Sequence, residues 1–261
     1  MSSVTRILVG VTAVAVAAVA VTGCSSKGVP YQSPSSAASS AAPATAAPAP
    51  TESMTPVAAA SGQLTGTQLE SVLLPQSFFP AGFTLASSSQ VSSGDTLTSS
   101  PPQYDPATAD CATFINNFGD PGFGETAMAS ESATAQSEQA FDQVVYQFAA
   151  PGAASAFVSG IQSLAGRCHS FTATDNGAKG TFSLRAAAGP SVGGHPSVEL
   201  TESGSLNGSS LTLNTLLSAS GVDVFAGAAV GLGVGAPTGL ATETIVYNLM
   251  KRQAAAAVLG G

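Results

Sequence analysis

Short runs of hydrophobic residues, many of them alternating with polar residues, fill positions 126–230 of this 261-residue chain. The run 141–148 combines aromatic and β-branched residues, which predicts a strand, and 126–131 is a weaker strand candidate. Five further strands are expected over residues 170–174, 180–187, 197–202, 211–217 and 222–230, each bounded by Gly, Asn, Asp or Ser. Strands that follow one another in this way favour an antiparallel sheet.

Helical periodicity interrupts the strand pattern between residues 153 and 166. Phe157, Ile161 and Leu164 repeat there on one face of a helix, and Pro151 fits its first turn. The residues therefore predict a helix that packs on the sheet.

Two more helices are expected near the ends of the folded part. A short one before Pro75 would begin at a capping box formed by Thr67 and Glu70. A long one over residues 238–259 carries an apolar stripe, and its basic pair at 251 and 252 would lie toward the negative end of the helix dipole.

These elements predict an α+β domain, in which two helices pack on an antiparallel sheet of about six short strands. Both long helices are expected on one sheet face, which leaves the other face or its rim for a cleft. Tyr146 fits either the core beneath a helix or the wall of such a cleft. Residues 87–110 are rich in Ser, Thr and Pro and predict a loop over the surface.

The first 23 residues have the layout of a secretory signal peptide, with one early Arg and an apolar run over residues 7–21. A helix over that run would span about 25 Å, less than the roughly 30 Å hydrocarbon core of a bilayer. Residues 21–24 read Val-Thr-Gly-Cys and resemble the bacterial lipobox, so Cys24 is the expected lipidation site. The alternative is a retained membrane helix. We expect a lipid-anchored protein on the extracytoplasmic face of the cell membrane.

The residues after Cys24 and up to Ser61 are dominated by Ala, Ser, Pro and Thr, which predicts a disordered tether. The interpretation is thus a lipidated Cys and linker over 24–61, followed by a single domain over 62–261. Only 8% of all residues are charged and the net charge is −8. Because no basic surface is available, nucleic acid is excluded as a partner.

Three cysteines divide into one lipid site and one pair. Cys111 and Cys168 are expected to form a disulfide, which the oxidising side of a membrane permits. Buried free thiols and a metal pair are the alternatives. A metal site needs more ligands at close spacing, and only His169 adjoins Cys168.

Two glycine-containing segments match the sequence patterns of catalytic or nucleotide-binding motifs. Residues 189–193 read Gly-Pro-Ser-Val-Gly, but no helix can begin after them, so Ser191 is not expected to be a nucleophile. Residues 231–235 read Gly-Leu-Gly-Val-Gly, but the third glycine is misplaced for a dinucleotide fingerprint. Both predict turns, as does Asn207 before its glycine.

The remaining titratable residues form no catalytic or metal-binding pattern. His169 and His195 are expected at the surface or at strand ends. Glu199 and Glu202 are three apart on one strand and would face opposite sides, and the acidic residues in general are expected to solvate the surface. No catalytic residue, metal or cofactor is predicted.

Several features together resemble a known family. They are Asp110 with Cys111, the aromatic strand that ends at residue 148, the segment 149–158, Cys168 and the terminal helix. Over residues 110–258 they resemble the PknH-like extracellular sensor domain, which occurs in a protein kinase and in actinobacterial lipoproteins. The resemblance implies an antiparallel sheet with two helices, disulfide support and a cleft for an unknown ligand. The family pattern has a second cysteine pair in its late strands, and residues 211–231 contain no cysteine.

The sequence therefore predicts a lipid-anchored cell-envelope protein whose sensor-like domain binds a small-molecule or protein ligand without chemistry. Its expected partners are the membrane, through the anchor, and that unidentified ligand. The alternative is a structural or interaction lipoprotein with no small-molecule pocket. A cleft with a few convergent polar groups would distinguish the first from the second.

Overall fold

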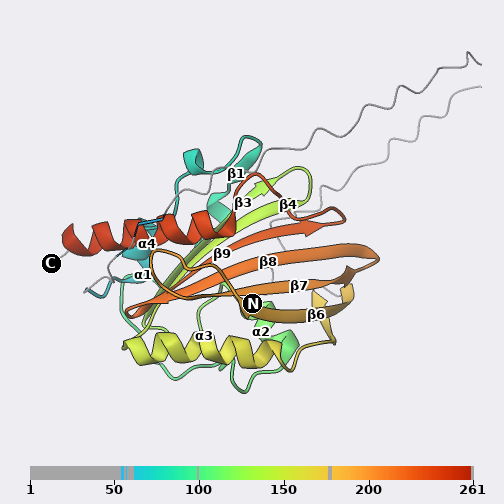
Figure 1. The fold of residues 1–261 in the computed structure, drawn as a ribbon, viewed down its shortest axis with the longest axis horizontal. Coiled ribbons are helices and arrows are strands. Elements are labelled where there is room, and N and C mark those ends of the chain that lie inside the picture. The colour runs from blue at the N-terminus through green and yellow to red at the C-terminus, as the bar shows by residue number, and fades with distance from the viewer. Residues whose placement is uncertain (1–53, 56, 58–61, 99, 176–177, 260–261) are drawn as a thin grey trace, which may run out of the picture. The chain divides into compact units, whose positions relative to one another are not determined.

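The computed structural model describes residues 54–259, apart from 56, 58–61, 99 and 176–177. The predicted signal peptide and Cys24 lie outside the described residues, as does most of the 24–61 linker. Within the described part, nine strands form one sheet in the order β1-β3-β4-β9-β8-β7-β6-β5, with β2 paired to β3 (Figure 1). The strands are β1 Phe83–Leu85, β2 Val91–Ser92, β3 Ala127–Ala135, β4 Gln139–Gln147, β5 Phe171–Asp175, β6 Ala178–Ala188, β7 Ser197–Leu206, β8 Ser209–Ser220 and β9 Asp223–Leu232.

Every pairing in the sheet is antiparallel, as predicted. The prediction of about six strands was too low. β1 and β2 were not predicted, because they are only three and two residues long and carry no alternation of their own. The weak candidate 126–131 belongs to the nine-residue β3, which pairs with β4 over eight positions.

The helices are α1 Gly66–Glu70, α2 Cys111–Asn117, α3 Pro151–Ala165 and α4 Thr242–Leu259, and the 3-10 turns are η1 Gln76–Phe78 and η2 Ser87–Ser89. The predicted capping box was wrong by two residues. Thr65, not Thr67, caps α1, and the Gln68 side-chain oxygen accepts a hydrogen bond from the Thr65 N–H. Gln68 can accept that bond through its amide oxygen as well as Glu70 could, so the local pattern did not distinguish the two registers.

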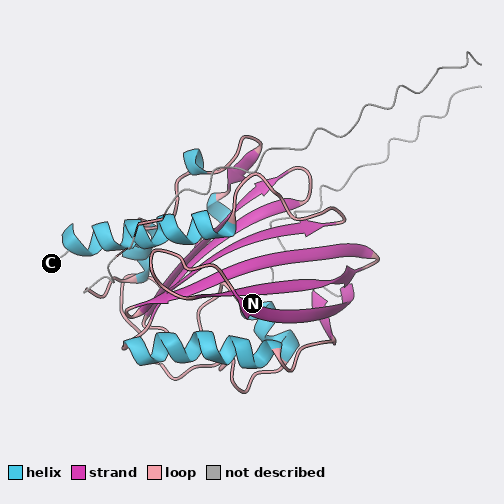
Figure 2. Ribbon diagram, viewed as in Figure 1, coloured by secondary structure: helices cyan, strands magenta, loops and turns pink. Residues whose placement is uncertain are grey.

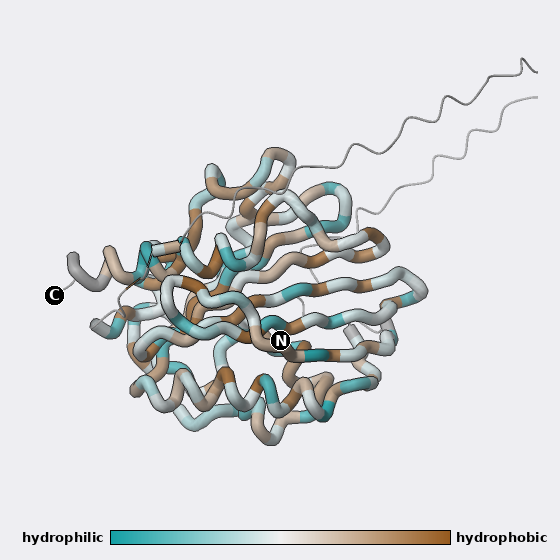
Figure 3. The backbone as a smooth tube through the Cα atoms, in the orientation of Figure 1, coloured by the Kyte–Doolittle hydropathy of each residue, from teal (hydrophilic) through white to brown (hydrophobic). Residues whose placement is uncertain are grey.

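The two long helices cover opposite faces of the sheet, which contradicts the expectation that both lie on one face (Figures 1 and 2). Ile245 and Leu249 of α4 pack in the same cluster as Phe141 of β4. Phe157 of α3 packs instead with Tyr146 of β4, an odd number of residues from Phe141. Because side chains alternate across a strand, the two clusters must lie on different faces. Figure 3 shows the brown hydrophobic positions interspersed along the central strands.

Two buried glutamines on the α4 face of β4 fasten the N-terminal segment to the sheet. Gln143 accepts a hydrogen bond from the Leu74 N–H and donates one to the Leu74 carbonyl, at 2.6 and 3.1 Å. Gln147 accepts from the Leu64 N–H at 2.7 Å and donates to Asp223 at 3.0 Å. Because buried polar groups without partners are costly, these bonds fix the path of the chain before β1.

Arg252 has a different role from the one predicted. α4 extends to Leu259 and has no basic residue in its last turn, so the pair at 251 and 252 does not lie at the negative end of the dipole. The Arg252 guanidinium instead donates hydrogen bonds to the carbonyls of Ser71 and Val72. It thereby joins α4 to the end of the α1 segment.

The last linker residues that the structure describes contact the domain. Met54 and Val57 pack against the α4 cluster, and Thr55 hydrogen-bonds to the Tyr247 hydroxyl at 2.8 Å. His195 contacts the Val57 carbonyl through Nε2 at 2.9 Å. In the described part of the chain, no helix has the length and apolarity needed to cross a membrane.

The glycine motifs form turns, as predicted. Asn207 and Gly208 connect β7 to β8 with φ angles of 50° and 83°, the left-handed pair that a tight hairpin turn requires. Residues 189–193 lie in a turn closed by a backbone bridge between Val192 and His195. Gly233, with φ of 71°, follows the end of β9.

Tyr146 belongs to the core. Its side chain is 0% exposed, and its hydroxyl oxygen accepts a hydrogen bond from the Gly119 N–H at 2.7 Å. Rings of Phe118, Phe123 and Phe157 surround it, with centroids 5.3–6.1 Å away. The prediction that Tyr146 lies in the core beneath a helix, rather than in the wall of a cleft, is confirmed.

Candidate functional site

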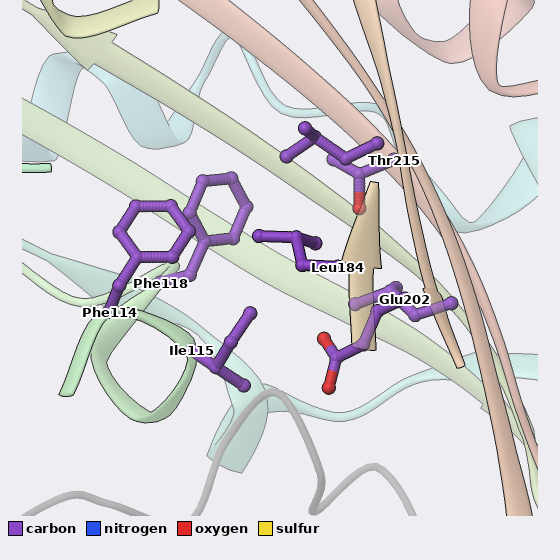
Figure 4. Close-up of a pocket in the computed structure, with 8 residues that line it drawn as sticks. Phe114, Ile115, Phe118, Leu184, Glu202 and Thr215 are labelled. Atoms are coloured by element: carbon purple, nitrogen blue, oxygen red, sulfur yellow. The ribbon is translucent and has the colours of Figure 1, made fainter. Parts of the chain in front are cut away.

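A small apolar cavity lies between α2 and the sheet, on the face that α3 also covers. It has two adjoining compartments, each with a volume of about 20 Å³, and Phe118, Leu213 and Thr215 line both. A volume of this size admits about one water molecule. The first compartment is lined by Phe114, Ile115, Phe118, Leu184, Leu200, Glu202, Leu213 and Thr215 (Figure 4), and the second by Phe118, Asp142, Val144, Leu213, Thr215, Ala226 and Ala228.

Glu202 of β7 is the charged residue of the first compartment. It is only 1% exposed, and neither carboxylate oxygen has a hydrogen-bond partner. Figure 4 shows its carboxyl group directed toward Ile115 of α2. Burial away from water disfavours the ionised form and raises the pKa of Glu202 to about 8. Glu202 is therefore mostly protonated at neutral pH.

Asp142 of β4 contributes a second carboxyl group to the second compartment. The residue as a whole is partly exposed, but its Oδ2 atom is buried and has no hydrogen-bond partner. Burial raises the pKa of Asp142 to about 7, although a hydrogen bond with Ser132 acts in the opposite direction. Unpartnered carboxyl oxygens of both residues, two from Glu202 and one from Asp142, thus open on the same apolar space.

The two carboxyl groups are too far apart to work as an acid–base pair. β7 and β4 are separated by β8 and β9, which is three strand spacings. At about 4.8 Å per spacing, with an offset of two residues along the strands, the backbones at the two residues are roughly 16 Å apart. Carboxyl pairs that share one reacting bond lie within about 10 Å. The arrangement therefore gives a lined cavity rather than a catalytic dyad.

Two interactions at the N-terminal end of α2 fix where the helix begins. Asp110 caps the helix by accepting hydrogen bonds from the Thr113 N–H and hydroxyl, which hold the pKa of Asp110 below its ordinary value. Cys111 forms the predicted disulfide with Cys168, which follows α3, at a Cα–Cα distance of 5.7 Å. The disulfide fixes the beginning of α2, and Phe114, Ile115 and Phe118 form the wall of the cavity opposite the sheet.

The residues singled out from the sequence lie elsewhere. His169 and Glu199 are exposed, and His195 is partly buried in its turn. Glu199 and Glu202 face opposite sides of β7, as expected. Within the described residues, no three His, Cys, Asp or Glu side chains come together in a way that could hold a metal ion.

The expectation that acidic residues only solvate the surface was wrong for Glu202, for the buried Glu125 and Asp223, and for the buried oxygen of Asp142. A sequence signal for Glu202 did exist, because Val198 and Leu200 precede it at alternate positions and mark the buried face of β7. No such signal revealed α2 as the cover of that face, since a seven-residue helix has too few turns for a periodic pattern. The predicted cleft on a face free of helices is thus replaced by a cavity under α2.

The raised pKa of Glu202 predicts a specific dependence of stability on pH. Below its ordinary pKa of 4.5 the carboxyl is protonated in both states; between 4.5 and about 8 only the folded state holds the proton. The free energy of unfolding should therefore fall as pH rises through that window, by up to about 1.4 kcal/mol per pH unit from this group. In urea titrations from pH 5 to 8, Glu202→Gln should flatten the slope and Glu199→Gln should not. Equal slopes for wild type and Glu202→Gln would contradict this assignment.

Comparison with known proteins identifies the fold. No family model and no curated protein matches the chain. Among solved structures, the extracellular domain of PknH from Mycobacterium tuberculosis is similar, with a TM-score of 0.50 and 14% identity, over 76% of this chain and 98% of that one. An uncharacterized protein from Mycobacterium smegmatis has a TM-score of 0.39 and 14% identity, over 73% of this chain and 95% of that one. The first similarity shows an α+β fold like that of the PknH extracellular domain. This is the PknH-like fold that the sequence features resemble.

Proposed function

We propose that this chain is a lipid-anchored protein on the extracytoplasmic face of a cell membrane, with a non-catalytic sensor-like domain that binds an apolar ligand beneath α2. The observation that carries the proposal is the apolar cavity with the unpartnered Glu202 in its wall. A carboxyl group that is buried without a partner lowers stability, so its presence is better explained by a ligand than by folding.

The anchor is supported by the sequence of the first 61 residues. The apolar run over residues 7–21 is too short to span a bilayer and is followed by a lipobox-like tetrapeptide that ends at Cys24. A Pro- and Ser-rich tether comes next. The Cys111–Cys168 disulfide fits the same location, since disulfides persist in oxidising compartments.

Ligand entry requires α2 to move. Each compartment admits about one water, so a larger ligand must displace Phe114, Ile115 and Phe118 outward. The disulfide holds the start of the helix, and Gly119, just after its C-terminal end, is hydrogen-bonded to Tyr146 and Ser130, so the turns between these two points must move outward. A ligand that binds the open position better than the closed one would shift α2 outward. Such a shift is the structural change by which the domain would report binding.

A catalytic function has no support among the residues that line the cavity. Thr215 carries the one hydroxyl group of the wall, and no histidine, lysine or cysteine lines either compartment. An apolar wall with few polar groups is typical of binding sites. The alternative, a structural lipoprotein without a pocket, would need a filled sheet face beneath α2.

Octanol is the probe that tests the proposal. Thr215→Leu should fill the shared wall of both compartments and weaken octanol binding to the purified full chain at least tenfold, measured by titration calorimetry. Thr212→Leu is the matched control, because Thr212 lies on the same strand with its side chain on the opposite face. Thermal melts should accompany both, since overpacking alone can destabilise a core. Absence of octanol binding to the wild type, or equal binding by both variants, would contradict the proposal.

A further inference from the structure

We infer that the ligand of this cavity belongs to the class of apolar primary amines, with its ammonium group bound to Glu202 and its hydrocarbon body against α2 and β8. This inference rests on the proposed function and adds the chemical class of the ligand.

The first argument is the chemistry of the wall. In the compartment of Glu202, six of the eight lining residues are aliphatic or aromatic. The polar exceptions are Glu202 and Thr215, on the neighbouring strands β7 and β8. An ammonium group has three N–H donors, and both Glu202 oxygens lack a donor. The wall therefore offers acceptors for a donor-rich head and apolar contacts for the rest of the molecule.

The second argument is charge. No lysine, arginine or histidine lines either compartment, and the only titratable groups there are Glu202 and, in the adjoining compartment, Asp142. Glu202 shares its compartment with Phe114 and Ile115 of α2, Phe118 at the end of that helix, Leu184 of β6 and Leu213 of β8, and none of these adds a charge. A cation can pair with the ionised carboxylate in a medium where opposite charges attract strongly, whereas an anion finds no opposite charge in either compartment. Cationic ligands are therefore favoured over anionic ones of the same length.

The third argument is the pH dependence that amine binding should show. The raised pKa of Glu202, about 8, means that the free cavity holds a proton at neutral pH. An ammonium ligand pairs with the ionised carboxylate, so binding must release that proton. Amine affinity should then increase by about 50-fold between pH 6 and pH 8, since the ionised fraction of a group with that pKa increases by this factor. A neutral alcohol releases no proton and should show no such increase.

The experiment compares octylammonium, octanol and octanoate, which share one chain and differ in the head group. Their affinities for the purified full chain are measured by calorimetry at pH 6 and pH 8, with wild type, Glu202→Gln and the exposed control Glu199→Gln. Wild type and Glu199→Gln should prefer octylammonium to octanol at least tenfold at pH 8. Glu202→Gln should lose that preference and the pH dependence while still binding octanol.

The outcomes separate this inference from the proposed function. If octanol binds and octylammonium binds no better, or if Glu202→Gln keeps the preference, the amine assignment is wrong and the cavity remains a binding site. A preference for octanoate would also overturn the assignment. If none of the three probes binds, both the amine assignment and the proposed function are wrong.

Discussion

Replacement of Tyr146 by alanine should lower the free energy of unfolding by about 4 kcal/mol, because the change removes a fully buried ring from the centre of an aromatic cluster. It also leaves the Gly119 N–H without the acceptor that the Tyr146 hydroxyl provides. Urea denaturation of wild type and variant measures the effect.

Two variants separate the contributions to this loss. Tyr146→Phe keeps the ring and should cost only about 1–2 kcal/mol, the value of the hydrogen bond and of the orphaned donor. Tyr247→Ala is the matched control, because Tyr247 is partly exposed on α4 and should cost less than about 1 kcal/mol. A Tyr146→Ala variant as stable as wild type would place Tyr146 outside the core.

Replacement of Cys24 by serine should abolish partition of the chain into a detergent phase. The proposed anchor depends on a single thioether at that residue, and acyl burial supplies about 0.8 kcal/mol per methylene group, which serine cannot replace. Detergent phase separation of wild type and Cys24→Ser, expressed in a bacterium that lipidates such chains, measures the change. Cys111→Ser is the control, since it removes a cysteine without removing the anchor. If wild type and Cys24→Ser partition alike, residues 7–21 are a retained membrane helix.

The elements with strong local patterns could be predicted from the sequence. The strand 141–148 was recognised because aromatic and β-branched residues fit a pleated, buried surface, and it is β4. α3 and α4 were recognised by their apolar stripes, and the Cys111–Cys168 disulfide by the pairing of two cysteines in a chain with a predicted signal peptide. Each of these signals is either a pattern within a short segment of the sequence or the presence of a particular residue type.

The arrangement in space could not be predicted in the same way. An apolar stripe states which side of a helix is buried, but not which face of the sheet receives it, so α3 and α4 were placed on one face instead of two. The cavity depends on that arrangement, because α2 covers the α3 face beside β7 and β8. Glu202 became a candidate binding residue only once the cover over its strand was known.

The central claim, that an apolar ligand binds beneath α2, is tested most directly by methyl NMR of isoleucine. The described chain contains three isoleucines, and they report on three places: Ile115 lines the cavity, Ile161 lies on α3 and Ile245 on α4. Titration of the purified full chain with octanol should shift the Ile115 methyl resonance strongly and leave those of Ile161 and Ile245 nearly unchanged. An unmoved Ile115 resonance at saturating octanol, or a larger shift at Ile161 or Ile245, would contradict the claim.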